Sequence, residues 1–258
     1  MGRSELPVSR AAGQALSPPR RSVLLGALGA AAALSAFARP AAAAAAAASA
    51  PVPYPLLTRA DWGADESLRF AVGGAELWPP EFHPVQTLSI HHTADESSNP
   101  DPAARVRSIY RNDAVGAGKE YGDIGYQYVI DENGRVYEGR WSGTAGTVAH
   151  DSAGRLVTGA HIGGYNSGNV GIALLGTFTR TPAPAAARAT LIQLLAELAA
   201  RHSIDPLATV VYRNPISGVT RTVPAIGGHL DWAATLCPGT VHADLPAIRT
   251  ETAGLING

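Results

Sequence analysis

A strand that ends in two histidines is predicted at Leu88-Ser89-Ile90-His91-His92-Thr93, where an apolar alternation gives way to polar residues. The other predicted elements are strands at 126–130, 135–138 and 170–176 and helices at 103–112, 184–202 and 246–255. Strands mixed with helices over this length are typical of layered domains. We therefore expect an α/β fold, a single layered domain with a central mixed β-sheet flanked by helices.

Residues 1–50 have the composition of an export leader. Arg20-Arg21 precede a short apolar stretch and then small residues, and the arginine pair resembles a twin-arginine signal. A membrane anchor is the alternative, but Arg39-Pro40 interrupt the apolar run before about 20 spanning residues accumulate. We expect a leader at 1–50, a linker or arm at 51–57 and one domain at 58–258, with no stable membrane insertion after leader removal.

The charge of the mature chain excludes one class of partner. Residues 1–50 carry five of the twenty basic and one of the twenty-one acidic residues, so the remainder has a formal net charge of −5. Nucleic-acid-binding proteins carry clustered lysines and arginines that neutralise phosphates. We therefore expect no nucleic-acid partner, and we expect a secreted, cell-wall-associated monomer.

The chain has a single cysteine, Cys237, which cannot form an internal disulfide. Such a residue is buried apolar filler, a reactive thiol or a metal ligand. His229 precedes it by eight residues in a stretch rich in Gly and Pro, and His91 ends a predicted strand, where α/β proteins place ligands. A lone histidine at a strand end is more often structural. Two imidazoles and one thiolate would nevertheless leave a zinc ion one open position, the arrangement of catalytic zinc.

Eight segments, in order, span about residues 57–250 and resemble the family of peptidoglycan recognition proteins and type 2 N-acetylmuramoyl-L-alanine amidases. Three of them are Ile90-His91-His92-Thr93-Ala94, Asp123-Ile124-Gly125-Tyr126-Gln127-Tyr128 and Thr235-Leu236-Cys237-Pro238-Gly239. The others lie at 59–63, 134–140, 159–167, 170–178 and 228–231.

The resemblance implies a zinc-dependent amidase that hydrolyses the bond between the lactyl group of N-acetylmuramic acid and L-alanine of the stem peptide. The implied zinc ligands are His91, His229 and Cys237, and the implied catalytic residues are Tyr126 and Thr235. Members that have lost catalysis typically lack the cysteine, so its presence favours activity. Leu230 departs from the family pattern, in which Arg is common at that position.

Four further residues, His92, His161, Tyr165 and Asn166, are expected to contact the substrate, which would be bacterial peptidoglycan or muropeptides. For His92 a role beside the metal ligands is an equal alternative. The main alternative function is a non-catalytic peptidoglycan-binding recognition protein, whose folded domain would look the same. A zinc amidohydrolase that acts on another amide is a second alternative.

Overall fold

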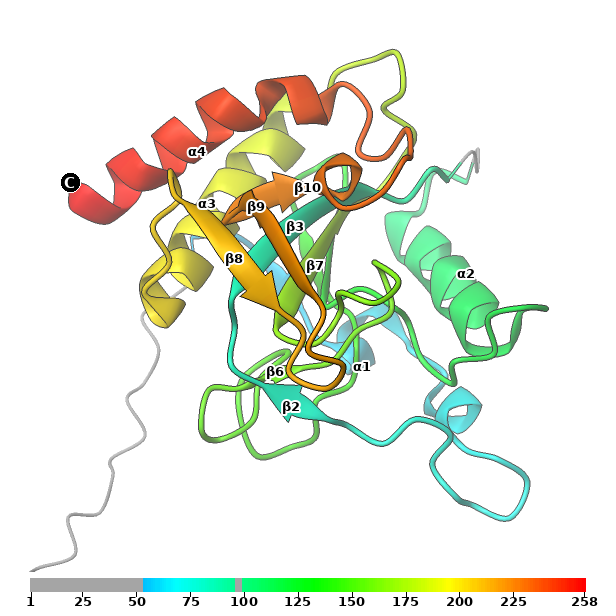
Figure 1. Cartoon of the computed structure of the whole chain (residues 1–258). Coiled ribbons are helices and arrows are strands. Elements are labelled where there is room, and N and C mark those ends of the chain that lie inside the picture. Colours follow the sequence, from blue (N-terminus) through cyan, green and yellow to red (C-terminus); the bar gives the residue numbers. More distant parts are fainter. Residues whose placement is uncertain (1–52, 96–98) are drawn as a thin grey trace, which may run out of the picture. The chain divides into compact units, whose positions relative to one another are not determined.

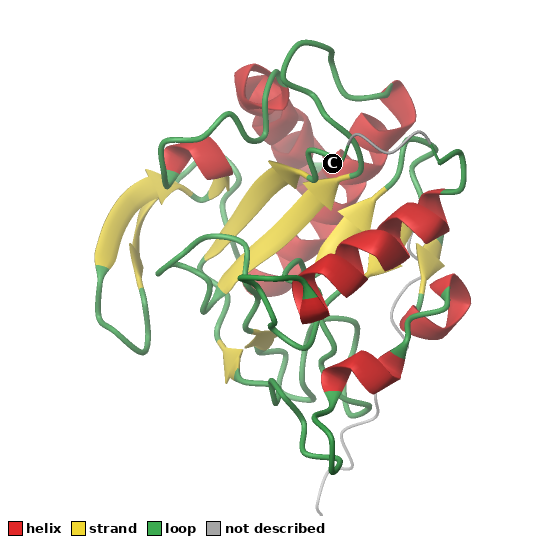
Figure 2. Ribbon diagram, turned by 90° about the vertical axis from the view of Figure 1, so that its right-hand side faces the viewer, coloured by secondary structure: helices red, strands yellow, loops and turns green. Residues whose placement is uncertain are grey.

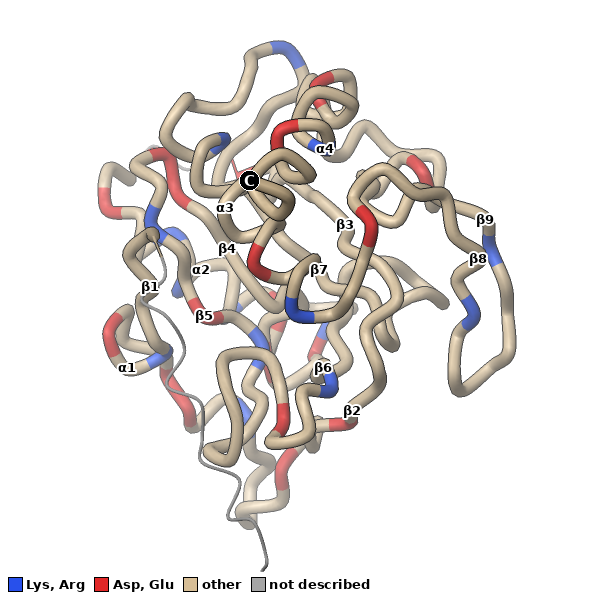
Figure 3. Tube along the Cα trace, turned by 90° about the vertical axis from the view of Figure 1, so that its left-hand side faces the viewer, with Lys and Arg blue, Asp and Glu red and all other residues tan. Residues whose placement is uncertain are grey.

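A computed structural model of the chain describes residues 53–95 and 99–258. The predicted leader, with Arg20-Arg21, lies outside these residues. Among the helices described, none is both long and apolar enough to cross a membrane. Lysines and arginines are scattered among the acidic residues along the traced chain rather than collected on one element (Figure 3).

The central sheet has six strands in the order β1-β5-β4-β7-β3-β10 (Figure 1). The strands are β1 (Leu56–Leu57), β5 (Val136–Glu138), β4 (Tyr128–Ile130), β7 (Asn169–Leu174), β3 (Thr87–His92) and β10 (Ile226–Gly228). The pair β4–β5 is antiparallel and all other neighbours are parallel. The sheet is therefore mixed, and the predicted fold class is confirmed.

Helices cover both faces of this sheet, with α2 in front of it and α3 and α4 behind it in Figure 2. The helices are α1 (Arg59–Trp62), α2 (Pro102–Val115), α3 (Ala185–His202) and α4 (Val241–Asn257), with short 3-10 helices η1 (Glu66–Arg69) and η2 (His229–Asp231). Ile90 and Ile172 belong to the core under α3 and α4, whereas Val129 and Tyr137 belong to the core under α1 and α2. This division follows the alternation of side chains along each strand.

Two small sheets flank the central one. They are β2 (Phe82–His83) with β6 (Leu156–Val157), and the hairpin β8 (Thr209–Arg213) with β9 (Thr220–Pro224). Figure 2 shows the hairpin projecting to the left of the main sheet. The Tyr212 hydroxyl donates to the Ser167 carbonyl at 2.8 Å, and the Tyr212 ring meets the Trp232 ring edge-on at 5.2 Å. These contacts hold the hairpin beside η2.

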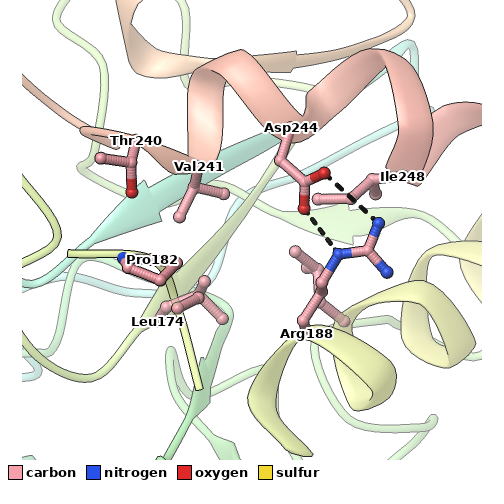
Figure 4. Close-up of a pocket in the computed structure, with 9 residues that line it drawn as sticks. Leu174, Pro182, Arg188, Thr240, Val241, Asp244 and Ile248 are labelled. Atoms are coloured by element: carbon pink, nitrogen blue, oxygen red, sulfur yellow. Dashed lines mark hydrogen bonds and ion pairs between the residues drawn. The ribbon is translucent and has the colours of Figure 1, made fainter. Parts of the chain in front are cut away.

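The layer behind the sheet is joined by Arg188 of α3, whose guanidinium donates to Asp244 and Glu251 of α4. A cavity of about 250 Å³ lies beside this ion pair, under Leu174 at the end of β7 (Figure 4). Leu174 faces the same side as Ile172, and His91 faces the other side. The cavity is therefore separated from the predicted zinc ligands by the sheet.

Two segments differ from the sequence expectations. The described part of the predicted linker or arm contains the edge strand β1, which pairs with β5, and Tyr54 is buried before it. The predicted helix at 246–255 begins five residues earlier, at Val241, so Pro246 lies inside α4. A proline near the start of a helix lacks one N–H donor but keeps a helical φ, so it does not mark the helix start here.

Candidate metal centre

The two adjacent histidines of β3 serve opposite faces of the sheet because successive strand side chains alternate. His92 lies on the face of Ile90, is 5% exposed, and its Nδ1 atom accepts the backbone N–H of Phe178 at 3.1 Å. The His92 side chain thus fixes the loop after β7. His91 is 1% exposed and lies on the other face, where the remaining candidate residues gather.

The register of β10 brings His229 to His91. Gly228 pairs with Ile90, and since the two strands are parallel, the next residue of each chain segment lies alongside. The ring centroids of His91 and His229 are 4.8 Å apart. His229 begins η2, where Asp231 acts as a cap because its Oδ2 atom accepts the Gly228 N–H at 2.7 Å.

Cys237 returns to the end of β3 from the loop between η2 and α4. Its Sγ atom lies 3.6 Å from His91 Nδ1 and accepts the backbone N–H of His92 at 3.3 Å. The Thr235 hydroxyl accepts the Cys237 N–H at 3.2 Å. A Cβ atom on Gly228 would lie 2.9 Å from the Pro238 ring, so only glycine allows the loop this close to β10.

The three predicted ligands fit a zinc ion. The ligand atoms of His91, His229 and Cys237 all lie within 4.8 Å of one another. Zinc–sulfur and zinc–nitrogen bonds of about 2.3 and 2.0–2.1 Å at a tetrahedral angle place the two ligand atoms roughly 3.6 Å apart. This equals the distance from His91 Nδ1 to Cys237 Sγ.

Burial adjusts the protonation of this group toward cation binding. It lowers the pKa of His91 well below its usual range, with neighbouring histidines adding to the effect, and it also lowers the pKa of His229. Both imidazoles are therefore neutral at pH 7, with lone pairs available. Burial raises the pKa of Cys237 to about 11, against the opposing effect of the His92 N–H. A metal ion would displace the thiol proton, as thiolate ligation requires.

Tyr126 lies beside the three ligands, with its ring centroid 5.3 Å from that of His91. Among the described residues its hydroxyl has no hydrogen-bond partner. Burial, with smaller contributions from Cys237 and Asp113, raises the pKa of Tyr126 above its usual value. The hydroxyl is therefore protonated at neutral pH and acts as a hydrogen-bond donor rather than a base.

The expected substrate contacts at 161–166 occupy different positions. His161 is 9% exposed and its Nδ1 atom lies 3.1 Å from His91 Nε2, a proximity that no sequence pattern indicated. Burial lowers the pKa of His161 to about 4, so the ring is neutral. The Asn166 side-chain oxygen accepts the N–H groups of His161 and Ile162, and the half-buried Tyr165 ring contacts Trp232 at 5.2 Å.

Comparison with known proteins identifies this constellation. The chain is 32% identical over 161 residues to a short peptidoglycan-recognition protein of Drosophila melanogaster, a match covering 60% of this chain and 69% of that protein. It is 32% identical over 172 residues to a human N-acetylmuramoyl-L-alanine amidase, covering 63% of this chain but only 24% of the longer human protein.

A solved structure of wild-type Drosophila PGRP-LB superposes with a TM-score of 0.52 and 25% sequence identity, covering 75% of this chain and 94% of that one. The family model Amidase_2, described as N-acetylmuramoyl-L-alanine amidase, matches residues 81–240, which are more than half of the chain and include all three predicted zinc ligands. The chain therefore belongs to the N-acetylmuramoyl-L-alanine amidase (Amidase_2) family.

Proposed function

We propose that this protein is a zinc-dependent N-acetylmuramoyl-L-alanine amidase, which hydrolyses the amide between the lactyl group of N-acetylmuramic acid and L-alanine of the stem peptide. The convergence of His91, His229 and Cys237 at distances suited to zinc carries this proposal. Three protein ligands leave one position for water or substrate, which is the coordination of catalytic rather than structural zinc.

The reaction needs stabilisation of the negative charge that develops on the carbonyl oxygen as water attacks the amide. A zinc ion held by the three ligands supplies Lewis acidity for the carbonyl and for the attacking water. Tyr126 supplies a protonated hydroxyl beside the ligands, and it donates a hydrogen bond to the developing oxyanion. Thr235 positions the thiolate, because its hydroxyl holds the backbone N–H of Cys237.

The substrate class follows from the relatives. The similar proteins bear names that specify peptidoglycan recognition or cleavage of the N-acetylmuramoyl-L-alanine bond. The partner we propose is therefore bacterial peptidoglycan or its muropeptide fragments. This polymer lies outside the cytoplasm, and the arginine pair and apolar stretch in residues 1–50 suit export to it.

Digestion of purified peptidoglycan tests the proposal. The mature protein, its Cys237→Ser variant, and a chelated sample before and after zinc addition are incubated with the polymer, and new L-alanine amino termini are quantified. We expect release by the mature protein, loss of release on chelation, recovery with zinc, and no release by the variant.

The binding-only alternative gives a different result in the same assay. A zinc-loaded protein that sediments with the polymer yet releases no amino termini would establish recognition without catalysis. The variant is a suitable control for folding because serine matches cysteine closely in size, and circular dichroism would verify that its domain is intact.

A further inference from the structure

We propose that His161 is a positioning residue, which holds His91 in the tautomer that presents its Nδ1 atom to the metal. This inference rests on the proposed zinc site. It assigns His161 to the support of a metal ligand in place of the substrate contact expected from sequence.

The direction of each hydrogen bond follows from the one group whose role is fixed. The Asn169 carbonyl oxygen can only accept, so the Nε2 atom of His161, 3.0 Å away, carries a proton and donates it. A neutral imidazole has a single N–H. The Nδ1 atom of His161 is therefore an acceptor.

The same reasoning passes to the metal ligand. His91 Nε2 lies 3.1 Å from the accepting His161 Nδ1, so His91 Nε2 must carry the proton. The Nδ1 atom of His91 is then unprotonated, and this is the atom that lies 3.6 Å from Cys237 Sγ. The carbonyl of Asn169 thus determines, through two rings, which nitrogen of His91 is free to bind zinc.

The relay is built on a rigid frame. The Asn169 side chain accepts a hydrogen bond from Ser89 of β3 at 2.9 Å and donates one to the Tyr165 carbonyl at 3.0 Å. The His161 ring lies directly over β7, where a Cβ atom on Gly171 would come within 2.5 Å of its Cδ2 atom. Glycine at 171 therefore makes room for the imidazole between the strand and His91.

The burial of His161 argues against a direct contact with substrate. Its side chain is almost fully enclosed, and both ring nitrogens are already engaged by His91 and Asn169. No polar atom of the ring remains for a stem peptide. Ligating histidines generally donate their second N–H to an outer acceptor, and loss of that acceptor commonly weakens metal binding by roughly 10–100-fold.

Two substitutions separate this role from the alternatives. His161→Asn keeps an acceptor oxygen near the position of Nδ1, whereas His161→Leu has similar bulk and no acceptor. Zinc affinity is measured by competition with a chromophoric chelator, and KM and kcat are measured on muropeptide. We expect the leucine variant to bind zinc roughly 10–100-fold more weakly, the asparagine variant to stay within about 3-fold of wild type, and KM to change little in the zinc-saturated variants.

Equal zinc affinity in the leucine variant and wild type, with a raised KM, would overturn the proposal in favour of substrate contact. Equal losses of zinc affinity in both variants would overturn it in favour of simple packing. Nitrogen-15 NMR of the metal-free wild-type protein gives a readout independent of activity and of zinc. We expect His91 to be protonated on Nε2, and protonation on Nδ1 would contradict the relay even if the amidase activity is established.

Discussion

The Nδ1 atom of His91 lies 3.6 Å from the Sγ atom of Cys237, although 146 positions separate the two residues in sequence. The parallel pairing of β10 with β3 produces this proximity, because it returns the chain to the end of β3 before the cysteine loop begins. The metal centre therefore depends on the topology of the sheet. Changes that disturb the approach of that loop should weaken metal binding without any loss of a ligand.

Gly228→Ala is the most direct such change. The new methyl group would lie 2.9 Å from atoms of Pro238 and His242, so the loop that carries Cys237 must shift. We expect zinc affinity to fall by roughly 10-fold, a loss of the size seen when metal ligands are misplaced. Gly254→Ala in α4 is the matched control, since no atom lies within 4 Å of its added methyl group, and its zinc affinity should equal that of wild type. Chelator competition on both variants measures the difference.

Tyr126→Phe removes the hydroxyl that we assign to the oxyanion while keeping the ring against His91. We expect kcat to fall by about 10²–10³-fold, the typical cost of one oxyanion donor. Zinc content should not change, because the hydroxyl is not a ligand. Steady-state kinetics on muropeptide, with metal analysis of the same samples, checks both statements. Wild-type kcat in the variant would remove Tyr126 from the catalytic residues.

The His150–His202 pair predicts loss of stability in acid. Burial lowers the pKa of each residue to about 4, and the two Nε2 atoms share one proton at 3.0 Å. Since unfolded histidine has a pKa near 6.5, the unfolded state binds more protons between pH 6.5 and 4. The pair's contribution to the unfolding free energy is thus fully present above about pH 6.5 and lost as the pH falls toward 4.

His202→Gln tests this pair, because glutamine can donate to His150 Nε2 but does not titrate. In metal-free protein, the unfolding free energy should fall between pH 7 and 5 by about 1 kcal/mol less in the variant than in wild type, allowing for the partial exposure of His202. Urea denaturation at the two pH values gives both numbers. An identical pH dependence of the two proteins would show that the pair does not titrate as described.

Export provides a separate prediction. Replacing Arg20-Arg21 with Lys-Lys should abolish secretion by a twin-arginine route, which moves folded proteins and would allow zinc to be bound before Cys237 meets an oxidising exterior. Immunoblots of medium and cell fractions measure this outcome. Undiminished secretion of the variant would exclude the twin-arginine route.

The elements with strong local patterns could be predicted from the sequence. β3, β7 and α3 agree with the predicted segments 88–93, 170–176 and 184–202, because their apolar spacing reflects the core that they face. The hairpin of β8 and β9 was missed, although its Val- and Thr-rich strands flank the turn signals Asn214-Pro215 and Ser217-Gly218. That signal was available in the sequence.

Other features are not visible in local patterns. β10 is three residues, Ile226–Gly228, and it is a strand only because β3 lies beside it. The proximity of His91, His229 and Cys237 could be predicted from the family resemblance, but not from spacing. The contact of His161 with His91 depends on how the loop before β7 folds over Gly171, a long-range packing relationship that residue types do not indicate.

Hydrolysis of a defined N-acetylmuramoyl peptide in water enriched in oxygen-18 tests the central claim most directly. The account predicts two products by mass spectrometry, a free stem peptide that begins with L-alanine and a muramic acid whose lactyl carboxyl group carries one oxygen-18 atom. Both should form with the zinc-loaded protein and not with Cys237→Ser. Intact substrate after incubation with the zinc-loaded protein, or cleavage at any other bond, would contradict the account.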